Sequence, residues 1–321
     1  MKRHISFPLL TLTFFIFFLS GRTAKAQDDN ILSLRLMTFN IRHGAGMDDV
    51  IDLDRQAAVI TDAMPDVVGL QEVDSCVKRS GYKPQAKLLG TKTGMHATFG
   101  GAIPLTGGKY GVAILSKEAP MSVRNIPLPG TEKRTLLVCE FQEFVFATTH
   151  LDLDEECRLS SLPIIIEEAE RWGDKPFFIC GDWNDTPSST LIKNMRKEQF
   201  YFLNGIVNAN SNYTFPATSP NRIIDYIASY GKKYKAIKKR TVINEPNASD
   251  HRPVLVEITL ESYTTGIQDI NNWTIGQSDN CEGMQSSNSE IYDLSGREMP
   301  SGTLPRGLYI QKNNRRKVLV K

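Results

Sequence analysis

The stretch FFICGDWNDTP, residues 177–187, decides how the rest of the chain is interpreted. Its apolar start predicts a buried strand, and Gly181 lets the backbone leave that strand in a conformation that a side chain would resist. Asp182 and Asn184 follow two residues apart, so in an extended chain both side chains leave on the same side. A carboxylate and an amide placed in this way suit a divalent cation, an oriented water, or both. The same residues also make a good turn, so matching strand ends elsewhere must decide between the two interpretations.

Other predicted strands also end in polar side chains. The set is Asn40, Glu72, His150, Asp250 and His251. A glutamate at the end of an apolar strand needs a partner, which a metal ion or a salt bridge would provide. Asn40 equally suits a turn, and a single histidine is commonly a structural residue. These residues therefore indicate a functional site only if the fold brings them together.

Asp225 lies apart from this set, inside the predicted strand 222–228. It has an apolar residue on either side. A carboxylate in that position requires a specific partner, because its burial is otherwise costly.

Apolar strands alternate with helical patterns along most of the chain. Strands are predicted at 32–41, 66–70, 110–116, 121–126, 134–141, 144–149, 177–180, 222–228 and from 254 onward, and helices at 53–64, 83–93, 155–172 and 188–195. Residues 94–109 and 204–220 are interpreted as loops. The pattern predicts a layered α/β protein whose site lies at one edge of its sheets.

The N-terminal residues 1–26 predict a secretory signal peptide. A basic start precedes an apolar run too short to span a bilayer, and Ala24-Lys25-Ala26 provides a cleavage site. We therefore expect an exported protein, whether periplasmic, at the cell surface or secreted, with no transmembrane segment. The segment carries four basic residues and no acidic one, so its removal changes the formal charge from +2 to about −2. That charge argues against a partner bound mainly through counterion release, although a local basic groove is compatible with it.

Five cysteines are too few for a disulfide scaffold in a chain of 321 residues. Their odd number leaves at least one thiol unpaired. Cys139 and Cys180 stand in apolar runs, so we expect them in the core. Whether Cys76 and Cys157 pair is open, and no cysteine spacing suggests a zinc site.

The strand-end residues share one chemistry. Several carboxylates and amides indicate a hard cation, Mg²⁺ or else Mn²⁺ or Ca²⁺. Two histidines add proton transfer or stabilisation of an oxyanion. Metal, oriented water and histidine together are what hydrolysis of a phosphate ester needs.

Seven segments in order resemble the successive motifs of the endonuclease/exonuclease/phosphatase superfamily. They are TFNI (38–41), LQEV (70–73), YGVAILS (110–116), THL (149–151), GDWN (181–184), IDYI (224–227) and SDHRPV (249–254). The resemblance covers about residues 31–260. It implies a four-layer αββα sandwich of two mixed β-sheets and a metal-dependent phosphoesterase activity.

The resemblance also implies how the metal and the water are held. Glu72 is similar to the main metal ligand of the family, with Asn40 beside it. Asp182 is similar to the carboxylate that aligns or deprotonates the attacking water, and Asn184 to its partner in holding water and phosphate. Asp250 resembles the acid that completes the metal or histidine network. One metal or two, and the identity of the general base, stay open.

The phosphate contacts follow from the same resemblance. His251 is similar to the phosphate-contacting histidine, oriented by Asp225. His150 resembles a second histidine found in the deoxyribonuclease and sphingomyelinase branches, where apurinic-site endonucleases carry tyrosine. Arg134 matches a family arginine that contacts phosphate.

A composition change marks the end of the domain. Residues 261–289 are rich in polar and small residues and predict a linker, and residues 290–321 predict a small C-terminal β unit. Its segments YDLSGR (292–297) and GLYI (307–310) are similar to the C-terminal sorting domain of type IX secretion substrates. A β appendage without a sorting role is the alternative.

The expected function is a secreted Mg²⁺-dependent phosphoesterase, with diesters favoured, that acts as a monomer on a sugar phosphate, a phospholipid head group or a nucleic acid. An extracellular nuclease proper is one alternative, and lysine-rich residues 232–240 would give it a basic groove unless they form a solvated edge. A non-catalytic binding module on the same scaffold is the other alternative.

Overall fold

The computed structural model describes residues 31–261, 291–293, 307–311 and 316–320. The predicted signal peptide and almost all of the predicted linker lie outside these residues. None of the helices in the described part of the chain is long and apolar enough to cross a membrane.

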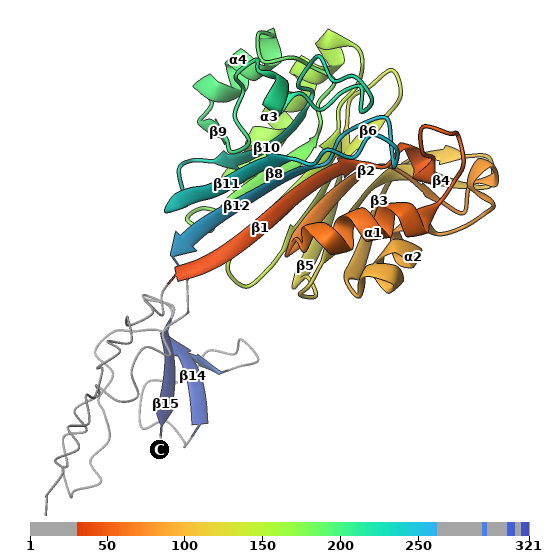
Figure 1. Ribbon diagram of the computed structural model, residues 1–321. Coiled ribbons are helices and arrows are strands. Elements are labelled where there is room, and N and C mark those ends of the chain that lie inside the picture. The colour runs from red at the N-terminus through yellow and green to blue at the C-terminus, as the bar shows by residue number, and fades with distance from the viewer. Residues whose placement is uncertain (1–30, 262–290, 294–306, 312–315, 321) are drawn as a thin grey trace, which may run out of the picture.

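Two six-stranded mixed sheets form the centre of the domain (Figure 1). The first sheet has the order β11-β12-β1-β2-β4-β3, and the second has the order β5-β6-β7-β8-β10-β9. The first is built from β1 (Ile31–Asn40), β2 (Val67–Ser75), β3 (His96–Leu105), β4 (Gly108–Ser116), β11 (Ala236–Val242) and β12 (Val254–Glu261). The second is built from β5 (Ser122–Leu128), β6 (Arg134–Glu140), β7 (Val145–His150), β8 (Phe177–Asp182), β9 (Phe200–Phe202) and β10 (Asp225–Tyr230). Each sheet contains one parallel pair, β1 with β2 and β7 with β8.

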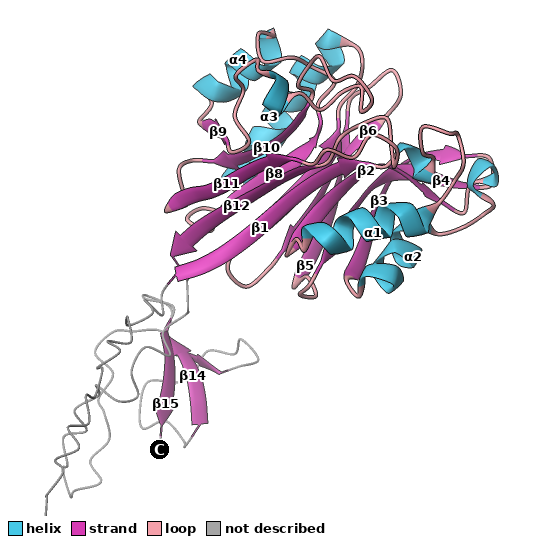
Figure 2. Ribbon diagram, in the orientation of Figure 1, coloured by secondary structure: helices cyan, strands magenta, loops and turns pink. Residues whose placement is uncertain are grey.

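Two helical layers cover the outer faces of the sheets, as Figure 2 shows. The layers are α1 (Leu53–Ala63) with α2 (Gln85–Thr93), and α3 (Glu155–Glu170) with α4 (Thr190–Lys197). Three short 3-10 turns lie in the connections: η1 (Arg42–Gly44), η2 (Lys78–Ser80) and η3 (Asn210–Asn212). The N-terminal ends of α1 and α3 are fixed by Asp52 and Asp154, whose side chains accept hydrogen bonds from the first free backbone N–H groups.

Three apolar clusters separate the four layers. One joins α1 and α2 to the first sheet, one fills the space between the sheets, and one joins α3 and α4 to the second sheet. Alternate residues of β1 enter different clusters: Leu36 faces the second sheet and Phe39 faces the helices. Strands buried on both faces are rich in apolar residues, which is why the sequence showed largely apolar runs. The predicted four-layer αββα sandwich is confirmed.

Three details of the sequence interpretation were wrong. Residues 94–109 are largely β3, which forms a hairpin with β4, although their small residues suggested a loop. β11 was missed because its lysines hide the pattern: it is the edge strand of the first sheet, and edge strands carry charges that prevent further pairing. Asp225 is the first residue of β10, so this strand begins three residues later than the predicted start at residue 222.

The remaining strands form a separate three-stranded antiparallel sheet. It contains β13 (Ile291–Asp293), β14 (Gly307–Gln311) and β15 (Arg316–Val320), in the order β13-β14-β15. These strands coincide with the short apolar runs that predicted a small C-terminal β unit.

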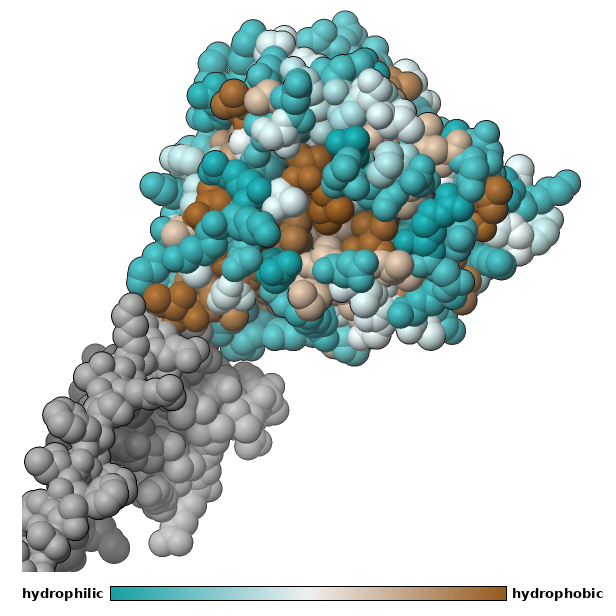
Figure 3. Space-filling view, in the orientation of Figure 1, coloured by the Kyte–Doolittle hydropathy of each residue, from teal (hydrophilic) through white to brown (hydrophobic). Residues whose placement is uncertain are grey.

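Figure 3 shows the same side of the domain by hydropathy. Hydrophilic residues cover the helical layers, and hydrophobic residues are visible in the middle of this face, between those layers. Cys139 and Cys180 lie fully buried between the sheets, as expected. Cys76, Cys139, Cys157 and Cys180 are all free thiols, so Cys76 and Cys157 do not pair.

Candidate active site

Strand register brings three of the expected residues to one level of the second sheet. Asp182 at the end of β8 pairs with His150 at the end of parallel β7. On its other side, Asp182 pairs with Asp225 at the start of antiparallel β10. An antiparallel strand begins at the edge where its parallel neighbours end. The position of Asp225 in the site follows from this direction of β10.

The first sheet contributes Asn40 from the end of β1 and Glu72 from within β2. The β2–β4 register shifts between Leu70 and Val73, and Glu72 has a left-handed φ of 56° at this bulge. A bulge redirects a side chain that regular pairing would place elsewhere, here toward the cleft.

Asn40 connects the two sheets. Its Nδ2 donates to Glu72 Oε1 at 3.0 Å and to Asp182 Oδ2 at 3.1 Å, and its Oδ1 accepts from the backbone N–H of Arg42. Its amide nitrogen therefore holds two carboxylates close together across the sheet interface. The expected role of Asn40 as a metal ligand stays a prediction.

The GDWN segment combines a turn with a site. Gly181 has φ +152°, and a Cβ there would collide with the carbonyl oxygen of Thr149. The backbone N–H of Asn184 donates to Asp182 Oδ1 at 2.9 Å, which closes the turn. The Asp182 and Asn184 side chains still line the cleft, so both interpretations of this segment hold. Trp183 points the other way, into the core beside Tyr226.

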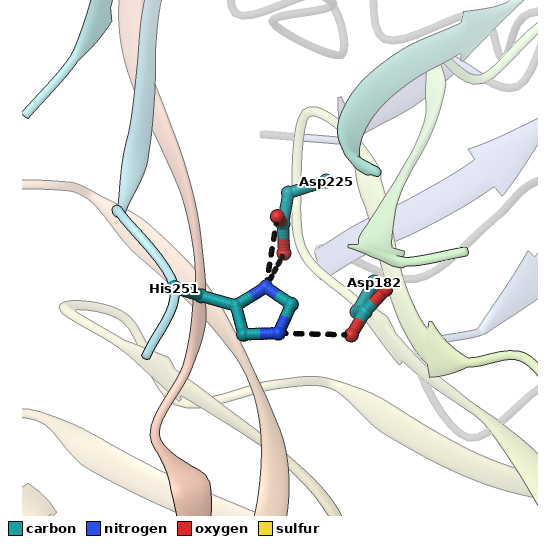
Figure 4. A group of neighbouring side chains, drawn as sticks. All are labelled: Asp182, Asp225 and His251. Carbon is teal, nitrogen blue, oxygen red and sulfur yellow. Dashed lines mark hydrogen bonds and ion pairs between the residues drawn. The ribbon is translucent and has the colours of Figure 1, made fainter. Parts of the chain in front are cut away.

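His251 is held between two carboxylates (Figure 4). Its Nδ1 lies 3.0 Å from Asp225 Oδ2, and its Nε2 lies 3.5 Å from Asp182 Oδ2. Burial opposes protonation of the ring, but Asp225 and Asp182 outweigh it and raise the pKa of His251 to about 10. His251 is therefore a cation at neutral pH in the metal-free protein, with Nε2–H directed toward the cleft side of Asp182.

His150 has the opposite environment. Its Nε2 lies 3.0 Å from Asn184 Nδ2, and its Nδ1 lies 3.4 Å from Arg134 Nη1. Burial lowers the pKa of His150 to about 4, although Asp182 opposes this shift. Both neighbouring groups are hydrogen-bond donors, which disfavours an imidazolium that would itself donate from both nitrogens.

Arg134 is fixed by acids that the sequence did not single out. Glu132 Oε1 lies 3.0 Å from its Nη1, and the buried carboxylate of Asp152 lies 3.5 Å from its Nε. Asp152 is itself held by Thr131 and by backbone N–H groups. It stands in the run LDLD directly after His150, a pattern that also suits an ordinary loop.

Asp250 lies at the margin of this group. Its Oδ2 is 3.9 Å from Arg42 Nε, and Ser249 Oγ donates to its Oδ1. It is close enough to act electrostatically on Glu72. The structure thus brings all nine expected residues to one edge of the two sheets, with Asp250 contributing from the side.

The cleft has a volume of about 590 Å³. The residues that line it are Glu72, Tyr110, Glu132, Arg134, His150, Leu153, Asp182, Asn184, Asp185, Thr186, Phe215, Arg222, Ile224 and His251. Phe215 and Arg222 come from the segment interpreted as a loop and from the residues just before β10, where no sequence signal marked them.

The donor atoms fit a hard divalent cation. Asp182, Asp225 and His251 each offer a ligand atom, and these atoms all lie within 4.8 Å of one another. Burial raises the pKa of the Glu72 carboxyl, and Asp250 and Asp182 add to the rise. A divalent cation would relieve this accumulation of anionic oxygens.

The fold and the site define a class: a two-sheet α/β sandwich with buried carboxylates and histidines at the sheet edges, forming a candidate metal site. The model of the endonuclease/exonuclease/phosphatase family matches residues 37–251. The chain belongs to this family, whose members are typically metal-dependent phosphoester hydrolases. The matched segment ends at His251 and includes every expected site residue.

Solved structures share the fold at low identity. A family protein from Bacteroides thetaiotaomicron aligns with a TM-score of 0.61 and 18% identity, covering 72% of this chain and 99% of the other. One from Beutenbergia cavernae aligns with a TM-score of 0.60 and 19% identity, covering 90% and 92%. A mannosyl-6-phosphatase of Bacteroides thetaiotaomicron aligns with a TM-score of 0.57 and 18% identity, covering 70% and 99%. No curated protein matches the chain.

Proposed function

We propose that this protein is an exported, Mg²⁺-dependent phosphoesterase that hydrolyses small phosphate esters. One observation carries the proposal: the Asp182 carboxylate is the point where Asn40 of the first sheet and both histidines converge, at 3.1–3.5 Å. A carboxylate so surrounded is positioned to hold and orient a water molecule beside a bound phosphate.

Each residue of the site has its own role in the proposed reaction. Asp182 and Asn184 orient the water, whose oxygen bonds to phosphorus as the ester P–O bond breaks and a proton reaches the leaving alkoxide. His251, kept protonated by Asp225, donates from Nε2 to a phosphate oxygen, where negative charge is stabilised. Arg134 and His150 support the opposite side of the phosphate.

Glu72 and Asn40 would hold the cation, with Asp250 nearby. When bound, the cation supplies charge neutralisation at the phosphate oxygens. The pKa raised to about 10 favours a donor role for His251 over metal ligation, because a protonated imidazole offers no lone pair at Nε2.

Two features favour a small substrate over a nucleic acid strand. A cleft of about 590 Å³ is of the size that encloses small molecules. The basic segment 232–235 follows β10, which runs away from the cleft, and the backbone N–H of Lys235 bonds Thr259 near the far end of β12. Those lysines therefore do not border the site.

The test is hydrolysis by the full chain with Mg²⁺ or with EDTA, on mannose 6-phosphate, bis(p-nitrophenyl) phosphate and supercoiled plasmid. The sugar phosphate is included because a mannosyl-6-phosphatase shares the fold. We expect Mg²⁺-dependent cleavage of the small esters and intact plasmid. Glu72→Gln should weaken Mg²⁺ dependence and turnover, whereas Glu198→Gln, an exposed residue after α4, should change neither.

Nicked plasmid with the wild-type protein and none with Glu72→Gln would make this a nuclease. No metal-dependent cleavage of any of the three would overturn the proposal and favour a non-catalytic binding module.

A further inference from the structure

One residue that lines the cleft, Arg222, is a cation without an acidic partner among the described residues. The Arg222 side chain is exposed, and its guanidinium carbon lies 4.7 Å from the centre of the Phe215 ring. Among the described residues, no carboxylate lies within ion-pair distance of Arg222. The other cleft arginine, Arg134, is buried and paired with Glu132 and Asp152.

Arg222 is connected to the reaction centre through one aromatic ring. Phe215 contacts His251 with a ring-centre distance of 4.7 Å, and Arg222 lies at the same distance from Phe215. A group bound at Arg222 would therefore sit one ring away from the phosphate contacted by His251.

The backbone holds this arrangement rigidly. Phe215 and Arg222 form an antiparallel bridge, with N–H···O bonds in both directions. The loop is also bonded to the His251 segment, because Arg252 N–H donates to Thr214 and Ala217 N–H donates to the backbone oxygen of Asp250. Rigid backbone support is what gives a binding group a defined position before the ligand arrives.

The charges of the cleft leave Arg222 as the site for an additional anion. Two acids of the cleft lining, Glu132 and Asp185, are already ion-paired with Arg134 and Arg158. A guanidinium on an aromatic ring keeps its five donors free and binds phosphate or carboxylate oxygens in pairs.

We propose that Arg222, supported by Phe215, forms a second anion subsite that selects substrates carrying another phosphate near the scissile one. This inference rests on the proposed phosphoesterase function and specifies its substrate class. The second phosphate could belong to a small bisphosphate or to a short nucleotide.

The experiment compares matched substrates that differ by one phosphate, using the full chain with Mg²⁺. Glucose 6-phosphate is paired with glucose 1,6-bisphosphate, and the dinucleotide TpT with its 5′-phosphorylated form. Arg222→Gln is expected to raise KM about tenfold for the member with two phosphates in at least one pair, as for loss of a charged hydrogen bond. KM and kcat for the one-phosphate member should stay within about twofold, since Arg222 contacts neither the water nor the scissile phosphate.

Arg222→Lys should restore part of the discrimination, because the charge returns without the paired donors. Arg196→Gln, an exposed arginine on α4 outside the cleft, controls for net charge. The pair that shows the effect identifies the source of the second phosphate.

Equal changes for both members of each pair, or no change in either pair, would overturn the subsite. Calorimetric binding of the same compounds provides a readout that does not need turnover. If the wild-type protein binds a two-phosphate compound through Arg222 but hydrolyses none of the compounds, the proposed hydrolytic function is contradicted. The Arg222 subsite would still be supported.

Discussion

The two sides of the cleft hold the same residue type in opposite states. His251 lies between Asp225 and Asp182, which raise its pKa to about 10 despite burial. His150 is equally enclosed, but burial lowers its pKa to about 4 and Arg134 contributes. Burial is common to both rings, so the charges of the neighbouring side chains decide the difference. One side of the cleft therefore offers a cationic donor and the other a neutral ring.

The largest expected effect is on the cationic side. His251→Ala should lower kcat/KM by a factor on the order of 10² or more, as for loss of a transition-state donor. His96→Ala, an exposed histidine at the start of β3, is the matched control. Steady-state kinetics on a small phosphate ester measures both, and near-normal activity of His251→Ala would remove it from the mechanism.

The next effect tests what keeps His251 charged. Asp225→Asn removes the carboxylate at Nδ1 but keeps a similar shape, so the pKa of His251 should fall from about 10 and kcat by roughly 10- to 100-fold. NMR titration of the metal-free protein follows the ring directly. Asp62→Asn, exposed on α1, should leave the titration unchanged. An unmoved pKa would mean that Asp182 alone holds the proton.

The neutral ring of His150 predicts how the stability of the folded protein changes with pH. The folded pKa of His150 is about 4 and its unfolded value is 6.5, so the unfolded chain binds the proton more readily in that interval. Stability should fall as the pH drops from 6.5 to 4, by about 3 kcal/mol from this ring. His150→Asn should remove this part of the slope in urea unfolding of the metal-free protein.

The same experiment separates the two rings. His251 has a folded pKa above 6.5, so its stabilising contribution is complete below pH 6.5 and is lost only as the pH rises toward about 10. His251→Asn should therefore flatten the alkaline side of the profile, whereas His150→Asn flattens the acidic side. Identical profiles for the two variants would contradict the assignment of opposite environments.

The smallest effect concerns the support of Arg134. Asp152→Asn weakens the charge contact at Arg134 Nε but keeps most of the loop's hydrogen bonds. We expect KM to rise about threefold and kcat to stay within about twofold, since Arg134 keeps its shorter contact with Glu132. Asp154→Ala, which removes the N-cap side chain of α3, provides a comparison in which stability changes more than KM.

Much of the fold could be predicted because the buried strands appear in the sequence as apolar runs. The run before Gly181 and the one before Asn40 are apolar on both faces, as strands between two layers must be. β3 and β11 could not be recognised, because β3 is rich in small residues and β11 carries the consecutive basic residues Lys238, Lys239 and Arg240 at an exposed edge. An apolar pattern in the sequence arises where a strand is buried, and the strands at the edge of a sheet are buried least.

The site could be predicted where a family motif marked the residue, as for Glu72 and His251. Asp152 and Arg222 were missed because their roles come from contacts between distant segments. Asp225 was expected inside a strand because the apolar residues Ile223 and Ile224 precede it, whereas β10 begins at Asp225. Its place beside Asp182 follows only from the antiparallel pairing of β10 with β8.

The register of β1 with β12 has a consequence for how the domain would be oriented when it is attached to another body. Ile31 pairs with Glu261 at one end of β1, and Asn40 lies at the other end, beside the cleft. Ten residues of strand place these two ends about 30 Å apart. Anything attached beyond Glu261, whether a fusion partner, a resin or a surface, would join the domain at the pole opposite the cleft. In a molecule attached in this way, the cleft would face away from the attachment point and toward the solvent.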